Sequence, residues 1–177
     1  MRFVPDSSCW IIIDELELLD IVAKLRDRVI LIREVIAEVR SDTFQHWMTH
    51  CNLPIGEQAL RRKVPPELTF GLDLGELAVL EYCLGSGAGW AVVDDLAARI
   101  VAERLGVPYI GTARFIKHLG DVGLLAPTFA SILIEKLPER GFFIDEEVIE
   151  AVLRAPRLSN QNSSDSGGNQ TALRPNR

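Results

Sequence analysis

Three aspartates follow two apolar runs of the chain and are the first residues to suggest chemistry. Asp94 and Asp95 come directly after the run Trp90–Val93, in the stretch WAVVDD. Asp6 follows the short run Arg2–Val4 after a single proline. In an open parallel sheet, ligands bind beyond the carboxyl ends of the strands. If the two runs form neighbouring strands, the three carboxylates converge on one edge of that sheet.

Two glutamates are expected close to the same edge. Glu38 lies near the end of the predicted helix REVIAEV, and Glu76 lies in the first turn of the predicted helix LGELAVLEYC. A cluster of carboxylate oxygens is the ligand set that Mg²⁺ or Mn²⁺ requires. A divalent cation would also offset the repulsion between adjacent aspartates. The candidate metal ligands are Asp6, Glu76, Asp94 and Asp95.

Each of these acids also has a purely structural interpretation. Asp6 can initiate a turn through its side chain, and Asp94 or Asp95 can be the N-cap of the following helix. Glu76 stands three residues after Asp73, which is the spacing of a capping box. Glu38 can be an exposed helix acid. Convergence of all the acids on one edge is what favours a functional site.

The elements that must position these acids alternate between short apolar runs and helical patterns, which predicts an α/β fold with a doubly wound parallel sheet. Unbroken apolar character, as in Trp90–Val93, is typical of strands buried on both faces. The predicted strands are Arg2–Val4, Arg28–Ile32, Trp90–Val93, Val107–Ile110 and Gly141–Ile144. The predicted helices cover about 14–27, 33–40, 43–51, 73–85, 96–105, 112–120, 127–140 and 145–154.

Composition favours one soluble domain. The chain has 177 residues, of which 47% are hydrophobic and 25% charged, and no apolar run approaches the roughly 20 residues of a membrane span. The start of the chain shows no secretory signal. Three cysteines without a CxxC pair favour a reduced, cytoplasmic protein. We expect one domain at 1–157 and a disordered, Ser/Asn/Gln/Gly-rich tail at 158–177.

Several stretches, in this order, resemble the DUF3368 family of PIN-domain-like proteins, which are related to VapC-type toxins. They are FVPDSSCWIIIDELELLDIV, RVILIREVIAEV, GLDLGELAVLEYCL and AVVDDLAARIVAERLGVPYIGTARFIKHLGDVGLL. The resemblance covers about Phe3 to Arg154. It implies a PIN-like fold that binds Mg²⁺ or Mn²⁺ and hydrolyses RNA. It also implies site acids at Asp6, Glu38, Glu76 and at Asp94 or Asp95, with Thr112 orienting a ligated water.

Two departures from the family pattern leave an alternative function open. Cys9 and Ile32 stand where the family usually has proline. These departures and the net charge of −6 favour a catalytically inactive PIN-like interaction module, whereas the retained acids favour a ribonuclease. Basic residues either steer RNA phosphates or are solvated helix charges: Arg61 to Lys63, Arg99, Arg104 and Arg114.

The resemblance to VapC-type toxins implies a small antitoxin protein as a partner. An acidic edge would be silenced by a basic partner segment that places arginine or lysine among the carboxylates. A homodimer is also possible. The apolar side chains of Phe44, Trp47, Met48 and Leu53 belong either to such a docking surface or to the core.

Overall fold

A parallel sheet of three strands organises the chain. The computed structural model describes residues 1–87 and 89–158. The strands β1 (Arg2–Pro5), β2 (Gly89–Val92) and β3 (Tyr109–Ile110) lie in the order β1-β2-β3 and are all parallel. The predicted α/β class and the parallel sheet are confirmed, and β1 is a direct neighbour of β2. Of the tail predicted at 158–177, residues 159–177 lie outside the part of the chain that the structure describes.

Helices make up most of the connections. Between β1 and β2 lie α1 (Ser7–Glu15), α2 (Leu19–Ala23), α3 (Arg33–Glu38), α4 (Asp42–Met48) and α5 (Leu74–Ser86), with 3₁₀ turns at Arg26–Arg28, Gln58–Leu60 and Pro66–Leu68. The helix α6 (Leu96–Leu105) connects β2 to β3. After β3 come α7 (Thr112–Asp121), α8 (Pro127–Glu135), a 3₁₀ turn at Pro138–Arg140 and α9 (Glu146–Arg154).

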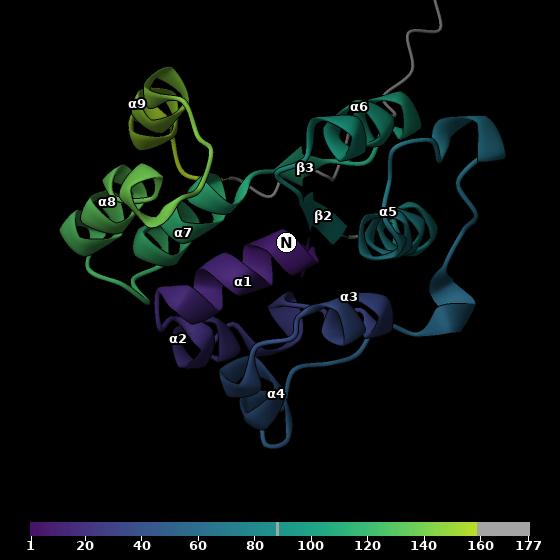
Figure 1. Ribbon diagram of the computed structural model, residues 1–177, viewed down its shortest axis with the longest axis horizontal. Helices are drawn as coiled ribbons and strands as arrows, with labels where there is room; N and C mark the ends of the chain where they lie inside the picture. Colours follow the sequence, from purple (N-terminus) through teal and green to yellow (C-terminus); the bar gives the residue numbers. More distant parts are fainter. Residues whose placement is uncertain (88, 159–177) are drawn as a thin grey trace, which may run out of the picture.

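Helices cover both faces of the sheet, as a doubly wound fold requires (Figure 1). Successive side chains of a strand point to opposite faces. The ring of Phe3 lies 5.1 Å from that of Phe115 in α7, measured between centroids. On the other face, Gly89 lies against Val4 and against Cys83 of α5. A Cβ atom added at Gly89 would be closer to both side chains than ordinary van der Waals contact. The sheet therefore lies between α5 and α7.

Helix caps place the site acids at the carboxyl end of the sheet. α5 begins with the capping box predicted from Asp73 and Glu76. α6 begins after Asp95 and ends at Gly106, whose φ of 67° is the left-handed conformation of a C-cap. Both boundaries of α6 are as predicted. Short connections capped at fixed residues leave little freedom in where the carboxylates lie.

Two predicted strands are wrong. Arg28 ends a 3₁₀ turn, and residues 29–32 are buried but form isolated bridges, from Val29 to Phe3 and from Leu31 to Ile55. Two different partners at alternate residues do not build a ladder. The run Gly141–Ile144 is a loop that leads into α9 and makes no strand pairing.

The predicted helix at 14–27 is divided into shorter pieces. α1 already begins at Ser7 and ends at Glu15, and Glu17 follows with a φ of 58°. A left-handed residue cannot continue a helix, so the chain turns there before α2. The early start of α1 matters for the site, because it makes Asp6 an N-cap.

The apolar residues considered for a docking surface belong to the core. Phe44, Trp47 and Leu53 are buried, and Met48 packs against the core. The ring centroids of Phe44 and Trp47 lie 5.6 and 5.7 Å from that of Trp10. The described helices are all too short or too polar to cross a membrane.

Candidate functional site

Asp6 lies at the junction of β1 and α1. Its main-chain N–H donates to the carbonyl oxygen of Val92 at 3.0 Å, which holds it beside the end of β2. Its Oδ1 accepts from the N–H of Cys9 at 2.7 Å, which is the N-cap contact of α1. Its Oδ2 is buried and has no hydrogen-bond partner among the described residues. Capping therefore accounts for only one oxygen of a carboxylate that is 1% exposed.

Asp94 binds protein donors with both carboxylate oxygens. Its Oδ1 accepts from Nη2 of Arg99 and from the N–H of Thr112, each at 3.1 Å. Its Oδ2 accepts from the hydroxyl of Thr112 at 2.5 Å. A Cβ atom at position 111 would lie 2.6 Å from Nη2 of Arg99 and 2.9 Å from Oδ1 of Asp94. The glycine at 111 therefore leaves the space that this ion pair occupies.

Asp95 is exposed and is the N-cap of α6. Its Oδ1 accepts from the N–H groups of Ala97 at 2.7 Å and Ala98 at 3.2 Å. The two adjacent aspartates thus have separate partners, a guanidinium with a hydroxyl for Asp94 and a helix terminus for Asp95. Each of the two carboxylates therefore has protein donors of its own. The metal roles predicted for both residues stay predictions.

Glu38 and Glu76 join the end of α3 to the start of α5. Oε2 of Glu76 accepts from the N–H of Asp73 at 3.0 Å, which completes the capping box. Oε1 of Glu38 accepts from the N–H of Gly75 at 2.8 Å, and its Oε2 is buried without a described partner. A Cβ atom at position 75 would lie 2.2 Å from that Oε2. Glycine at this position allows the two helix ends to meet.

The five predicted acids share one electrostatic environment, which we call the acidic edge: Asp6, Glu38, Glu76, Asp94 and Asp95. The pKa of Asp6 is raised to about 8, chiefly by burial, with smaller contributions from the charges of Asp94 and Glu76. Burial also raises the pKa of Glu76, and the charges of Asp95 and Glu38 add to that effect. Burial and the neighbouring carboxylates therefore both disfavour the ionised forms of Asp6 and Glu76.

The acidic edge fits a divalent cation in its donor chemistry. Carboxylate oxygens are the ligands of Mg²⁺ and Mn²⁺. The buried Oδ2 of Asp6 has no hydrogen-bond partner among the described residues, and the charges of Asp94 and Glu76 act on its carboxylate, so this oxygen is available as a metal ligand. The side chains are not yet arranged as a ligand set. Among the described residues, no three His, Cys, Asp or Glu side chains are grouped closely enough to hold an ion. Asp94 would have to share its oxygens with Arg99 or release them.

Comparison with protein families identifies the family of the chain. Residues 2–157 match the DUF3368 family, which is described as a PIN domain. The chain belongs to this family. The match supports a nuclease-like function of the PIN superfamily, whose nucleases act on RNA and generally use divalent metal ions. No curated protein and no solved structure gave a significant match to the chain.

Sequence reasoning missed the role of one residue in this PIN domain. The sequence predicts for Arg99 either a phosphate contact or a solvated helix charge, but its Nε donates to the carbonyl of Val93 at 3.0 Å while its Nη2 binds Asp94. It therefore fixes the end of β2. The signal for this role is faint, because an arginine five residues after an aspartate is common on any helix that follows a strand.

The other basic residues considered for RNA phosphates fall into two groups. Arg61 pairs with Glu34, and Arg114 is largely buried beside Asp121. Arg62, Lys63 and Arg104 are exposed. The second group alone is free to meet a phosphate without breaking an existing contact.

Proposed function

We propose that this PIN domain is a metal-dependent ribonuclease whose site is the acidic edge. The observation that carries the proposal is Asp6, a buried carboxylate with one unpartnered oxygen and a pKa raised to about 8. Burying such a group costs several kcal/mol unless a positive partner is present. A divalent cation held by Asp6, Glu76 and Asp94 supplies that charge. When bound, it also supplies an activated water and neutralises charge on the phosphate.

The residues of this chain have separate tasks in such a site. Asp6, Glu76 and Asp94 hold the cation. Thr112 orients the carboxylate of Asp94 through its hydroxyl and its N–H. Glu38 and Asp95 act as positioning residues: Glu38 accepts from the N–H of Gly75 in α5, and Asp95 accepts from the N–H of Ala97 in α6. One carboxylate of the edge accepts the proton of the attacking water.

Cleavage of mixed RNA in Mn²⁺ tests the proposal. We expect Asp6→Asn and Asp94→Asn to lower the rate by about 100-fold or more. Asparagine keeps the N-cap of α1, so Asp6→Asn removes charge while conserving the helix start. Asp27→Asn is the matched control, because Asp27 is an exposed acid on the 3₁₀ turn after α2. Equal RNA decay in all four proteins would show that the activity is a contaminant.

A second readout is independent of turnover. A ligand that binds only the folded protein raises the free energy of unfolding by RT ln(1 + [L]/Kd). Mn²⁺ is therefore expected to raise the melting temperature of the parent and of Asp27→Asn, but not that of Asp6→Asn. An equal rise in all three would place the cation elsewhere.

Two observations favour the alternative, a catalytically inactive interaction module. Arg99 already provides Asp94 with a positive partner, and the described acids are not gathered into a ligand set. In that case the parent protein neither cleaves RNA nor gains stability from Mn²⁺. The two measurements above thus distinguish the two functions.

We further propose that the acidic edge binds a small basic antitoxin. The pairing of Arg99 with Asp94 shows that this edge accepts a guanidinium, and the net charge of −6 steers basic segments toward the protein. A homodimer is the other assembly we consider. Expression with the neighbouring reading frames, followed by mass measurement of the purified complex, tests both. A monomer without a co-purifying small protein would contradict them.

A further inference from the structure

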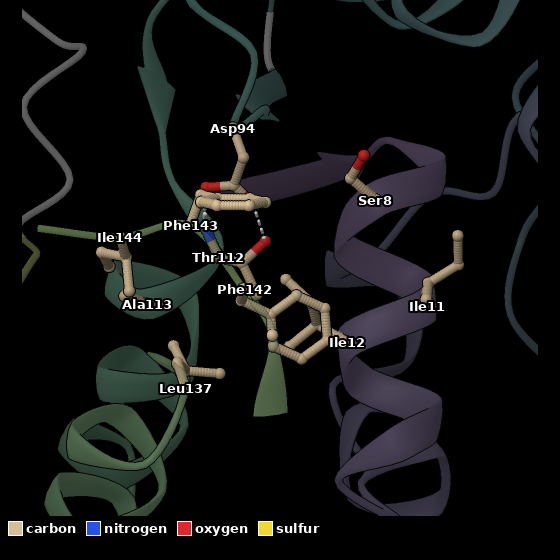
Figure 2. A pocket seen from close by; sticks show the side chains of 11 residues that line it. Ser8, Ile11, Ile12, Asp94, Thr112, Ala113, Leu137, Phe142, Phe143 and Ile144 are labelled. Carbon is tan, nitrogen blue, oxygen red and sulfur yellow. Dashed lines mark hydrogen bonds between the residues drawn. The ribbon is translucent and has the colours of Figure 1, made fainter. Parts of the chain in front are cut away.

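A small apolar pocket lies directly beside the acidic edge. It has a volume of about 280 Å³ and is formed by α1, the first turn of α7 and the loop Gly141–Ile144. Figure 2 shows Ser8 and Ile12 of α1 on one side, with Thr112, Phe142 and Phe143 across from them. Asp94 is part of the lining. The pocket and the candidate metal site therefore share a wall.

The lining combines apolar walls with a few polar groups. Ile12 and Leu137 are buried side chains of the core, and Phe142 packs partly against that core. The polar groups are the hydroxyls of Ser8 and Thr112 and the carboxylate of Asp94. Small-molecule sites have this character, and about 280 Å³ is slightly below their usual range of roughly 300–1,000 Å³. The space suits one planar ring system.

Phe143 stands at this pocket with its side chain fully in solvent. Its relative exposure is 108%, the highest among the large hydrophobic residues described. The loop that carries it leaves the preceding 3₁₀ turn through Gly141, whose φ is 85°. An aromatic ring offers 150–250 Å² of surface for burial, and here it faces water. A ligand that enters the pocket can cover this ring at no cost in broken contacts.

We propose that the pocket receives one base of the RNA substrate, with Phe143 stacking on that base. This inference rests on the proposed ribonuclease function and names the part of the substrate that lies next to the cleaved phosphate. A nucleobase is neutral and planar, so it can approach carboxylates that repel a phosphate. The exposed hydroxyl of Ser8 can bind its polar edge. Stacking of a base on an aromatic side chain is worth about 1–3 kcal/mol.

The pocket favours a base over a protein side chain for two reasons. Asp94, where the proposed reaction takes place, lines the pocket, and the base next to a scissile phosphate must lie within one nucleotide of that point. The pocket also presents an uncovered aromatic face together with a hydroxyl, the combination with which proteins bind unstacked bases. Phe143 would then contribute to the sequence preference of cleavage.

The experiment measures RNA binding without cleavage. Full-length Asp6→Asn protein is titrated into labelled eight-nucleotide RNAs of A, C, G or U. Two double variants, which carry Phe143→Ala or Phe143→Trp in addition to Asp6→Asn, are titrated in the same way, and the dissociation constants are compared. We expect Phe143→Ala to raise the dissociation constant by about 5- to 150-fold, which is 1–3 kcal/mol at 1.4 kcal/mol per tenfold. Phe143→Trp keeps the stacking face and should stay within about threefold of Asp6→Asn alone. Phe70→Ala is the matched control, because Phe70 is 96% exposed and does not line the pocket.

An RNA with a single abasic nucleotide identifies the base that enters the pocket. The abasic nucleotide is placed at each position of the RNA in turn. At the one position whose base stacks on Phe143, Phe143→Ala should cause no further loss of affinity. Equal affinity of Asp6→Asn with and without Phe143→Ala would overturn the pocket assignment and leave the ribonuclease proposal standing. Loss of a co-expressed protein partner upon Phe143→Ala, with unchanged RNA affinity, would assign the pocket to that partner instead. No RNA binding by any variant, together with no cleavage by the parent, would overturn both proposals.

Discussion

At the scale of single residues, the burial of Asp6 opposes the ionised form of its carboxyl, which a metal ligand requires. Its carboxyl is 1% exposed and its pKa is raised to about 8 from 3.8. Between these two values the unfolded chain has released the proton while the folded protein keeps it. The folded protein then binds more protons, so the free energy of unfolding falls as pH rises. Above about pH 8 both states are ionised and this loss is complete.

The first prediction follows from that sign. In EDTA, the parent should lose stability relative to Asp6→Asn as the pH rises from 4 to 8, by an amount on the order of 5 kcal/mol at 1.36 kcal/mol per pKa unit. Urea denaturation of both proteins at several pH values measures this difference, and the subtraction removes the titration of other groups. A constant difference across the range would mean that Asp6 ionises normally in the folded protein.

Asp95 allows the capping role to be separated from a role in metal binding. Its Oδ1 accepts from two N–H groups of α6, and its side chain is exposed. Asp95→Ala should lower the free energy of unfolding by about 0.5–2 kcal/mol, and Asp95→Asn should restore most of that loss. Both variants should keep the stabilisation by Mn²⁺, measured as a shift in melting temperature. Loss of the Mn²⁺-dependent shift in melting temperature in Asp95→Asn would indicate that Asp95 is a metal ligand.

At the scale of elements, α3 and α5 meet through a contact that excludes a side chain. The N–H of Gly75 donates to Glu38, and a Cβ atom at position 75 would lie 2.2 Å from Oε2 of that glutamate. Gly75→Ala should therefore displace the carboxylate and lower the free energy of unfolding by about 1–3 kcal/mol. In the Glu38→Ala background the same change should cost little, because the obstructing atoms are absent. A double-mutant cycle by urea denaturation gives the coupling, and additive effects would contradict the contact.

Elements with local end signals could be predicted from the sequence, and so could the acids that they position. Asp95 and Gly106 define both ends of α6 through an N-cap and a left-handed C-cap, and Asp73 with Glu76 defines the start of α5. These signals act within four residues of the chain. The predicted fold class left open whether the strands that carry Asp6 and Asp94 are neighbours, and the pairing of β1 with β2 in the structure meets that condition.

Features that depend on tertiary contacts could not be predicted in this way. The run Arg28–Ile32 has the composition of a strand, but its pairing is decided by partners at Phe3 and Ile55 that are distant in sequence. Apolar composition at Gly141–Ile144 likewise predicted a strand, whereas Phe143 lies in solvent beside the pocket. The ion pair of Arg99 with Asp94 also needs the close approach of Gly111.

At the scale of the whole molecule, charge limits how RNA can bind. The chain carries a formal net charge of −6, so long-range attraction of phosphates is weak. Several arginines are already paired within the structure: Arg61 with Glu34, Arg99 with Asp94 and Arg114 with Asp121. Affinity for RNA must therefore come mainly from the cation and from base contacts.

The final prediction is a shallow dependence of RNA binding on salt. For single strands, the logarithm of the binding constant falls with the logarithm of salt concentration by about 0.7 per phosphate contact. The three exposed basic residues considered above, Arg62, Lys63 and Arg104, then give a slope of about −2 in the Asp6→Asn protein. Lys63→Ala should reduce the slope by about 0.7, whereas Lys136→Ala, an exposed lysine at the end of α8, should leave it unchanged. Fluorescence anisotropy from 50 to 300 mM salt measures the slope. A slope steeper than about −4 would show that RNA is held mainly by phosphate contacts, contrary to the balance of charge in this protein.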